Sequence, residues 1–193
     1  MTNYRRSRIP GATYFFTVAL ADRSATTLVD EIGALRDACS ATRAERPFRC
    51  DAFVVLPDHL HAVWTLPEGD SDYSTRWRLI KARFTRAVLA KMGAKHPSYG
   101  RVGDFHPSHS KREKGERGVW QRRFWEHLIR DERGYRAHLE YCWGNPVKHG
   151  LVTRAVDWPY SSIHWDMRAG RVGAEWSGGL ADGEFGEVEG NRA

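Results

Sequence analysis

Cysteine is scarce in this chain, and its apolar runs are short. Only three of the 193 residues are cysteines. They lie far apart without CxxC spacing, which argues against a disulfide framework or a zinc knuckle and favours a reducing compartment. No apolar stretch reaches the roughly 18 residues of a membrane-spanning helix, and the basic N-terminus is not followed by the apolar core of a secretory signal. We therefore expect a cytoplasmic protein.

Lysine and arginine outnumber aspartate and glutamate over most of the chain. The net charge is +6 and the sequence pI is about 9.4. Many of the acids gather near the end of the chain, so the rest is more basic than the total suggests. A basic body with eight tryptophans fits a polyanionic partner such as nucleic acid, although many basic domains bind none. The Gly-rich acidic residues 177–193 predict a disordered tail, which either keeps the chain in solution or covers a basic groove as a DNA mimic.

The apolar pattern alternates between strand and helix periods. It predicts strands over 13–20, 48–56, 59–66 and 120–129, and helices over 27–45, from Ser74 past Val88, and over 131–144, where Pro146 follows. Residues 94–118 predict a mobile basic loop. This order fits an α+β fold, a ferredoxin-like or RRM-like antiparallel sheet with helices packed on one face. We expect a single domain over residues 1–176.

Two histidines lie one residue apart on a predicted strand. Because side chains alternate along a strand, His59 and His61 share one face and Leu60 lies on the other. Two neighbouring neutral imidazoles can bind a metal. They can equally fill a partly buried sheet face, and the pair alone leaves both interpretations open.

A polar stripe runs along the last predicted helix. His138, Tyr141 and Asn145 lie at positions i, i+3 and i+7, on one face. Asn145 before Pro146 also fits an ordinary helix end, where it would act only as a cap. Tyr141 could pack its ring and leave its hydroxyl in water. The stripe is therefore a candidate catalytic or binding site, but the stripe alone does not distinguish these roles from a structural one.

Three segments carry a resemblance to a known family. They are VLPDHLH at 55–61, WQRRFWEH at 120–127 and YCWGNPVKHG at 141–150, with WPYSS following at 158–162. In this order they resemble the REP-associated tyrosine transposases, relatives of the IS200-like single-tyrosine HUH transposases. The resemblance runs from Tyr4 to about Trp176 and implies the HUH transposase fold, a small antiparallel sheet with flanking helices.

The resemblance implies a role for each candidate site residue. His59 and His61 would bind a metal, Tyr141 would be the nucleophile, and Asn145 would be the third metal ligand, where relatives often have Gln. The implied ion is Mg²⁺ or Mn²⁺, whereas two imidazoles by themselves favour Zn²⁺ or Mn²⁺. The implied enzyme cleaves and rejoins single-stranded DNA with hairpin-forming, REP-like palindromes through a 5′-phosphotyrosine, and acts as a monomer.

DNA contacts are expected from arginines. The expected set is Arg5, Arg6, Arg8, Arg76, Arg83, Arg122 and Arg123, with nearby tryptophans stacking on unpaired bases. DNA binding would make the protein nucleoid-associated. Two other functions remain open at this point: a non-catalytic hairpin-DNA binder of the same fold, and an RNA-binding protein.

Overall fold

The computed structural model describes residues 6–95, 118–173 and 175–176. Arg5, most of the expected 94–118 loop and the expected 177–193 tail lie outside these residues. The elements are β1 (Thr13–Ala19), α1 (Thr27–Asp30), α2 (Ile32–Glu45), β2 (Arg49–Val55), β3 (His59–Thr65), α3 (Tyr73–Lys95), β4 (Trp125–Ile129), α5 (Glu132–Lys148), a 3₁₀ turn (Ala155–Asp157) and α6 (Ile163–Arg168). None of the described helices combines the length and apolarity needed to cross a membrane.

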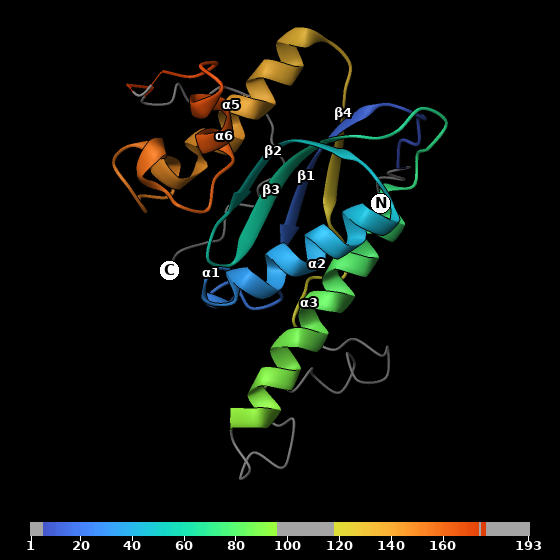
Figure 1. Ribbon diagram of the computed structural model, residues 1–193, viewed down its shortest axis with the longest axis vertical. Coiled ribbons are helices and arrows are strands. Elements are labelled where there is room, and N and C mark those ends of the chain that lie inside the picture. The colour runs from blue at the N-terminus through green and yellow to red at the C-terminus, as the bar shows by residue number, and fades with distance from the viewer. Residues whose placement is uncertain (1–5, 96–117, 174, 177–193) are drawn as a thin grey trace, which may run out of the picture.

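The strands form one antiparallel sheet in the order β2-β3-β1-β4 (Figure 1). Pro57 and Asp58 form the tight turn between β2 and β3, where the Leu56 backbone N–H donates to the His59 carbonyl at 2.8 Å. The predicted α+β class with an antiparallel sheet is therefore confirmed. The last strand begins at Trp125 rather than at 120, because Trp120 makes only an isolated bridge to Leu20.

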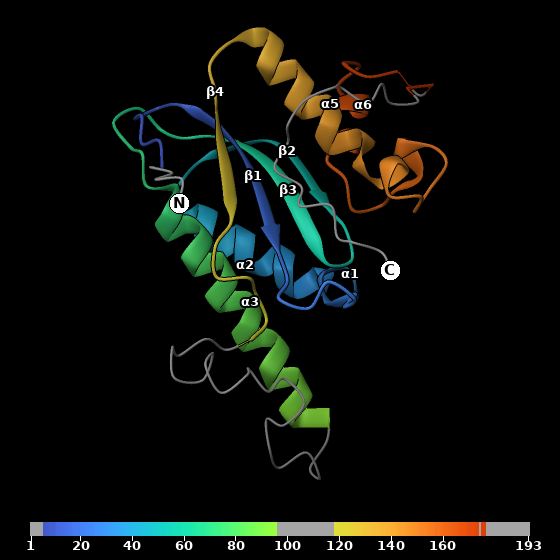
Figure 2. The same cartoon turned by 180° about the vertical axis from the view of Figure 1, so that it is seen from behind.

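Helices cover both faces of this sheet rather than the single face that the sequence predicted. On one face Leu60, Ala62 and Trp64 pack against α2 and α3. On the other face Phe15 and Val63 pack against α5 and α6, and Figures 1 and 2 show the helices on the two sides. The physical reason lies in β1, where every residue after the first is buried. A strand that is apolar on both sides needs cover on both sides.

Arg76 stabilises the start of α3 from inside the protein. Its side chain is 1% exposed, and its guanidinium donates to the carbonyl oxygens of Arg46, Pro47 and Asp72 at 3.2, 2.7 and 3.0 Å. A fourth bond, of 2.7 Å, is an ion pair with Asp70. The prediction that Arg76 contacts DNA is therefore wrong, because the loop before β2 and the start of α3 enclose its side chain.

Arg83 is also engaged by the fold. It donates to Thr42 Oγ1 at 2.6 Å and pairs with Glu45, so it joins α3 to α2. This contradicts the expectation of a side chain open to DNA phosphates. On the same helix Arg78 and Arg86 are exposed.

We expect Arg76→Met to lower the free energy of unfolding by about 3 kcal/mol. Methionine keeps the apolar stem but leaves three carbonyl oxygens without the donor that Arg76 supplies, and Asp70 without its cation. Arg78→Met, on the exposed side of the same helix, should change it by less than about 0.5 kcal/mol. Urea unfolding of the two variants measures the difference, and equal stabilities would contradict this role for Arg76.

Helix α5 continues through Pro146, although the sequence predicted an end near residue 144. The helix ends at Lys148, and Gly150 follows with φ of 66°. The Gly150 N–H donates to the Val147 carbonyl and the Leu151 N–H to the Pro146 carbonyl, both at 2.9 Å. This is a Schellman ending, in which glycine adopts the left-handed conformation. The last turn therefore stays helical and carries Asn145 inside the helix.

Candidate active site

His59 and His61 lie side by side on β3 under α5. Both side chains are buried, and their ring centroids are 5.0 Å apart. Leu60 packs into the core on the opposite face. The predicted shared face of the two imidazoles is confirmed, and it follows from strand alternation.

A carboxylate orients the imidazole of His59. The His59 Nδ1 lies 2.7 Å from Asp58 Oδ1, and Arg23 Nε lies 2.8 Å from the other Asp58 oxygen. Arg23 also lies 3.4 Å from Nδ1, but one nitrogen cannot donate to Asp58 and accept from Arg23 at once. The contact with Asp58 is shorter, so we assign the proton to Nδ1. The His59 Nε2 is then the acceptor nitrogen. It is buried and has no hydrogen-bond partner within the described part of the chain.

Burial shifts the pKa values of both His59 and Asp58. It lowers the pKa of His59, against the opposing effect of Asp58. Burial also raises the pKa of Asp58, but the His59 hydrogen bond and the nearby Arg23 outweigh it and hold that pKa below its usual value. His59 is therefore neutral at pH 7, with its Nε2 lone pair available to a ligand.

His61 is held from two sides. Its Nδ1 lies 2.9 Å from Thr17 Oγ1 on the neighbouring strand β1. Its ring stacks on Phe15 with centroids 5.4 Å apart. Both contacts fix the ring plane, so the two imidazoles keep one arrangement under α5.

Tyr141 reaches the histidine pair from α5. Its ring lies edge-on to His61 with centroids 5.3 Å apart, and its side chain is 3% exposed. Lys148, seven residues later, donates from Nζ to the Tyr141 hydroxyl at 3.2 Å and lies 5.0 Å above the ring. The tyrosine is therefore on the same side of the sheet as the histidines, with an ammonium group beside its oxygen.

Asn145 lies between two contacts that α5 makes with the histidines. Tyr141 contacts His61, and His149, at the end of α5, contacts His59 with ring centroids 5.1 Å apart. Asn145 is four residues from each, so all three share one helix face. Asn145 is fully buried. It is not the helix cap, because the C-cap is His149.

The residues present fit a divalent ion. The acceptor nitrogen of His59 is buried, and the other ring nitrogen bonds the Asp58 carboxylate, as it commonly does in histidines that bind a metal. Within the described residues, no group of three or more His, Cys, Asp or Glu side chains could hold a metal. A site here would therefore combine two imidazoles with the Asn145 amide and water, a donor set open to an exchangeable ion.

Asp58→Asn tests this orientation. We expect Mn²⁺ affinity to fall about 10- to 100-fold, because an amide cannot fix the His59 tautomer as a carboxylate does. Asp166→Asn is the matched control, since Asp166 pairs with Arg171 away from the histidines. Titration of each variant with Mn²⁺ measures the effect. Equal affinities would show that Asp58 does not support a metal ligand.

Comparisons with known proteins agree on one family. No protein-family model matches the chain. The REP-associated tyrosine transposase of Escherichia coli K12 is 41% identical over 187 residues, which cover 97% of this chain and 98% of that protein. The chain belongs to the REP-associated tyrosine transposases. A Haemophilus influenzae relative, provisionally named for the same family, is 43% identical over 178 residues, covering 92% of this chain and 94% of its own.

A solved structure of a REP-associated tyrosine transposase supports the same assignment. It is described as bound to a REP hairpin, and it superposes on this chain with a TM-score of 0.80 and 41% identity. The match covers 97% of this chain and 98% of that one. The resemblance seen in the sequence is therefore confirmed, together with the fold class.

Four more of the arginines expected to contact DNA lie in the described part of this REP-associated tyrosine transposase, and all four are at least partly exposed. Arg8, Arg122 and Arg123 are exposed. Arg6 lies over the Phe124 ring at 4.1 Å and 3.5 Å from the Glu126 carboxylate, so it packs against the end of the sheet near β4. DNA contact by these four arginines stays a prediction.

Four residues of the site were not selected from the sequence. Asp58 and Thr17 orient the histidines, while Lys148 and His149 come from the last turn of α5. Asp58 directly precedes the histidine pair, and the spacing of His149 from Tyr141 and Asn145 is a signal that could have found it. Thr17 gave no signal, because only the β1–β3 register places it opposite His61.

Proposed function

We propose that this chain is a metal-dependent transposase of single-stranded DNA. It binds hairpin-forming, REP-like palindromic DNA and cleaves and rejoins it through a 5′-phosphotyrosine on Tyr141. One observation carries the proposal: the Tyr141 ring packs against His61, and His61 in turn contacts His59, whose acceptor nitrogen is buried. A relative's structure with a REP hairpin supports the choice of ligand.

In the proposed reaction, Tyr141 is the nucleophile and the histidines with Asn145 would hold the ion. The Tyr141 oxygen attacks the scissile phosphorus, a new O–P bond forms, and the bond to the 3′ oxygen breaks to release a 3′-hydroxyl. A divalent ion, Mg²⁺ or Mn²⁺, held by His59, His61 and Asn145 would withdraw charge from the phosphate. The phosphotyrosine retains the energy of the broken bond, so a second 3′-hydroxyl can reverse the step and join another end.

A phenol is a weak nucleophile at neutral pH and needs help. Lys148 supplies part of it, because an ammonium 3.2 Å from the Tyr141 oxygen stabilises negative charge there. One chain supplies the tyrosine and both histidines, so we propose that a single copy is sufficient for cleavage.

Lys148→Met should slow cleavage roughly tenfold. The loss is smaller than the roughly 100-fold cost of removing a buried oxyanion donor, because Lys148 is exposed and water screens its charge. Lys148→Arg keeps the charge and should retain most of the rate. Single-turnover cleavage of a hairpin substrate measures both, and equal rates for Met and Arg would remove Lys148 from the mechanism.

The proposal is tested by incubating the protein with hairpin DNA that carries single-stranded flanks, with and without Mn²⁺. A covalent protein–DNA adduct on a denaturing gel, lost on chelation, is the expected result. Binding without an adduct under all conditions would instead indicate the second candidate, a non-catalytic hairpin-DNA or RNA binder of the same fold.

A further inference from the structure

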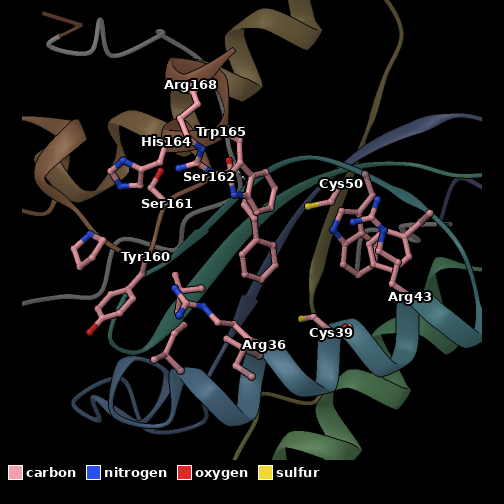
Figure 3. A pocket seen from close by; sticks show the side chains of 18 residues that line it. Arg36, Cys39, Arg43, Cys50, Tyr160, Ser161, Ser162, His164, Trp165 and Arg168 are labelled. Carbon is pink, nitrogen blue, oxygen red and sulfur yellow. Dashed lines mark hydrogen bonds between the residues drawn. The ribbon is translucent and has the colours of Figure 1, made fainter. Parts of the chain in front are cut away.

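A cavity lies at the β2 edge of the sheet, apart from the histidine site. It has a volume of about 560 Å³ and is bounded by α2, β2 and residues 159–168 (Figure 3). Small-molecule sites commonly have volumes of about 300–1,000 Å³. Phe53 and Val55 line it and pack on the face of α2 and α3, whereas Val54 belongs to the face of Tyr141. The cavity therefore opens on the side of the sheet opposite the proposed active site.

One wall of this cavity is fixed to the sheet by backbone hydrogen bonds. The Ser162 N–H donates to the Phe53 carbonyl at 2.7 Å, and the Val55 N–H donates to the Tyr160 carbonyl at 2.9 Å. The Phe53 N–H also donates to Ser162 Oγ at 2.9 Å. Residues 160–162 thus extend the sheet at its edge, and the wall keeps its shape before any ligand binds. Preorganisation of this kind lowers the cost of binding.

The cavity is positive on both sides. Its lining contains no carboxylate and three arginines, of which Arg36 and Arg43 come from α2 and Arg168 from α6. All three are exposed, and no hydrogen bond or ion pair joins them to another residue within the described ranges. Nearby Arg83 differs, since it pairs with Glu45. Guanidinium groups left open in this way match the geometry of phosphate.

Aromatic side chains complete the lining. Trp165 is 49% exposed and is one of the few large apolar side chains that the described part of the chain leaves in solvent. Figure 3 shows Trp165 and Arg168 on the α6 side, across the cavity from Arg36, and Tyr160 apart from them at the left of the view. Exposed aromatic faces beside arginines are how proteins bind single-stranded nucleic acid, because every base offers a face for stacking.

We propose that this cavity binds an unpaired nucleotide of the DNA strand. The base stacks on Trp165 or Tyr160, and the flanking phosphates pair with Arg36, Arg43 and Arg168. The inference rests on the proposed function for its ligand, DNA, but not on the chemistry of Tyr141. An acidic polypeptide would also satisfy the arginines, but it would leave the exposed tryptophan without a stacking partner.

Photo-crosslinking tests the base contact. The Tyr141→Phe protein, with chelator present, is irradiated with a hairpin whose single-stranded flank contains 5-iodouracil, and cross-linked peptides are identified by mass spectrometry. A cross-link to Trp165 or Tyr160 is the expected result. Cross-links confined to other residues would overturn the proposal. Because no cleavage is needed, this result is independent of whether Tyr141 forms an adduct.

Affinity measurements test the arginines and the need for an unpaired strand. Trp165→Ala, and the double variant Arg36→Gln with Arg168→Gln, should each weaken binding of the flanked hairpin roughly tenfold. Neither should affect a blunt hairpin. Arg78→Gln is the matched control, since it removes an exposed charge outside the cavity, and it should change affinity less than twofold.

Two further outcomes would overturn the assignment. An equal loss on flanked and blunt hairpins would place duplex phosphates, rather than an unpaired nucleotide, on these arginines. Release of the flanked DNA by poly-glutamate from the wild-type protein but not from the double arginine variant, without any Trp165 cross-link, would assign the cavity to an acidic polypeptide.

Discussion

Replacing Tyr141 with phenylalanine should abolish the covalent protein–DNA adduct and reduce cleavage by at least about 10³-fold. The phenol oxygen is the attacking atom in the proposed mechanism, and phenylalanine lacks it. The ring and its contacts with His61 and Phe15 remain. DNA affinity and stability should therefore stay close to wild type. Denaturing gels and fluorescence anisotropy measure the two properties separately.

Tyr135→Phe is the matched control for this variant. Tyr135 lies on the same helix, and its hydroxyl donates to Asp51 at 3.1 Å, away from the histidines. Burial and the nearby Asp51 raise its pKa to about 12, which makes it a poor nucleophile. Its loss should leave the adduct intact. An adduct formed by the Tyr141→Phe protein would assign the nucleophile to another residue.

His61→Asn should reduce cleavage by about 10³-fold and weaken Mn²⁺ binding. It removes one of the two imidazoles that would hold the ion, and charge withdrawal from the phosphate is worth several kcal/mol. The smaller asparagine also leaves space beside Phe15 and Tyr141. Stability is therefore measured alongside activity by urea unfolding.

His138→Asn separates the loss of a ligand from the loss of packing. His138 lies on α5 and packs against Phe15 with ring centroids 4.9 Å apart, while the His61 and Phe15 centroids are 5.4 Å apart. The substitution should affect stability in a similar way but leave Mn²⁺ affinity unchanged. If both variants lose metal binding equally, His61 acts through packing alone.

Strand alternation and motif order made much of the site predictable. The apolar residues around His59 and His61 indicated a strand, and alternation then fixed their common face. The helical spacing of Tyr141 and Asn145 placed both on one stripe of α5. Sequence periodicity could not place that stripe against the histidines. That depends on α5 crossing β2 and β3, which only the tertiary structure shows.

The predictions for Arg76 and Pro146 were wrong because the contacts that decide them join residues far apart in the sequence. Arg76 is charged, so the pattern put it on a solvated face, but carbonyl groups at residues 46 and 47 enclose it. Pro146 predicted a helix end because proline disfavours a helical residue before it. Trp143 and Asn145, which flank this turn of α5, are buried, and their packing outweighs that preference. Both errors arise where tertiary packing overrides a local rule.

The central claim is that Tyr141 and an ion on His59 and His61 act on one phosphate. A crystal structure of the Tyr141→Phe protein with flanked hairpin DNA and Mn²⁺ tests it most directly, since anomalous scattering locates the ion. We predict Mn²⁺ on the Nε2 atoms of both histidines, bound to a phosphate that faces the ring of residue 141. An ion bound elsewhere, or a DNA strand that keeps every phosphate away from that ring, would contradict the account.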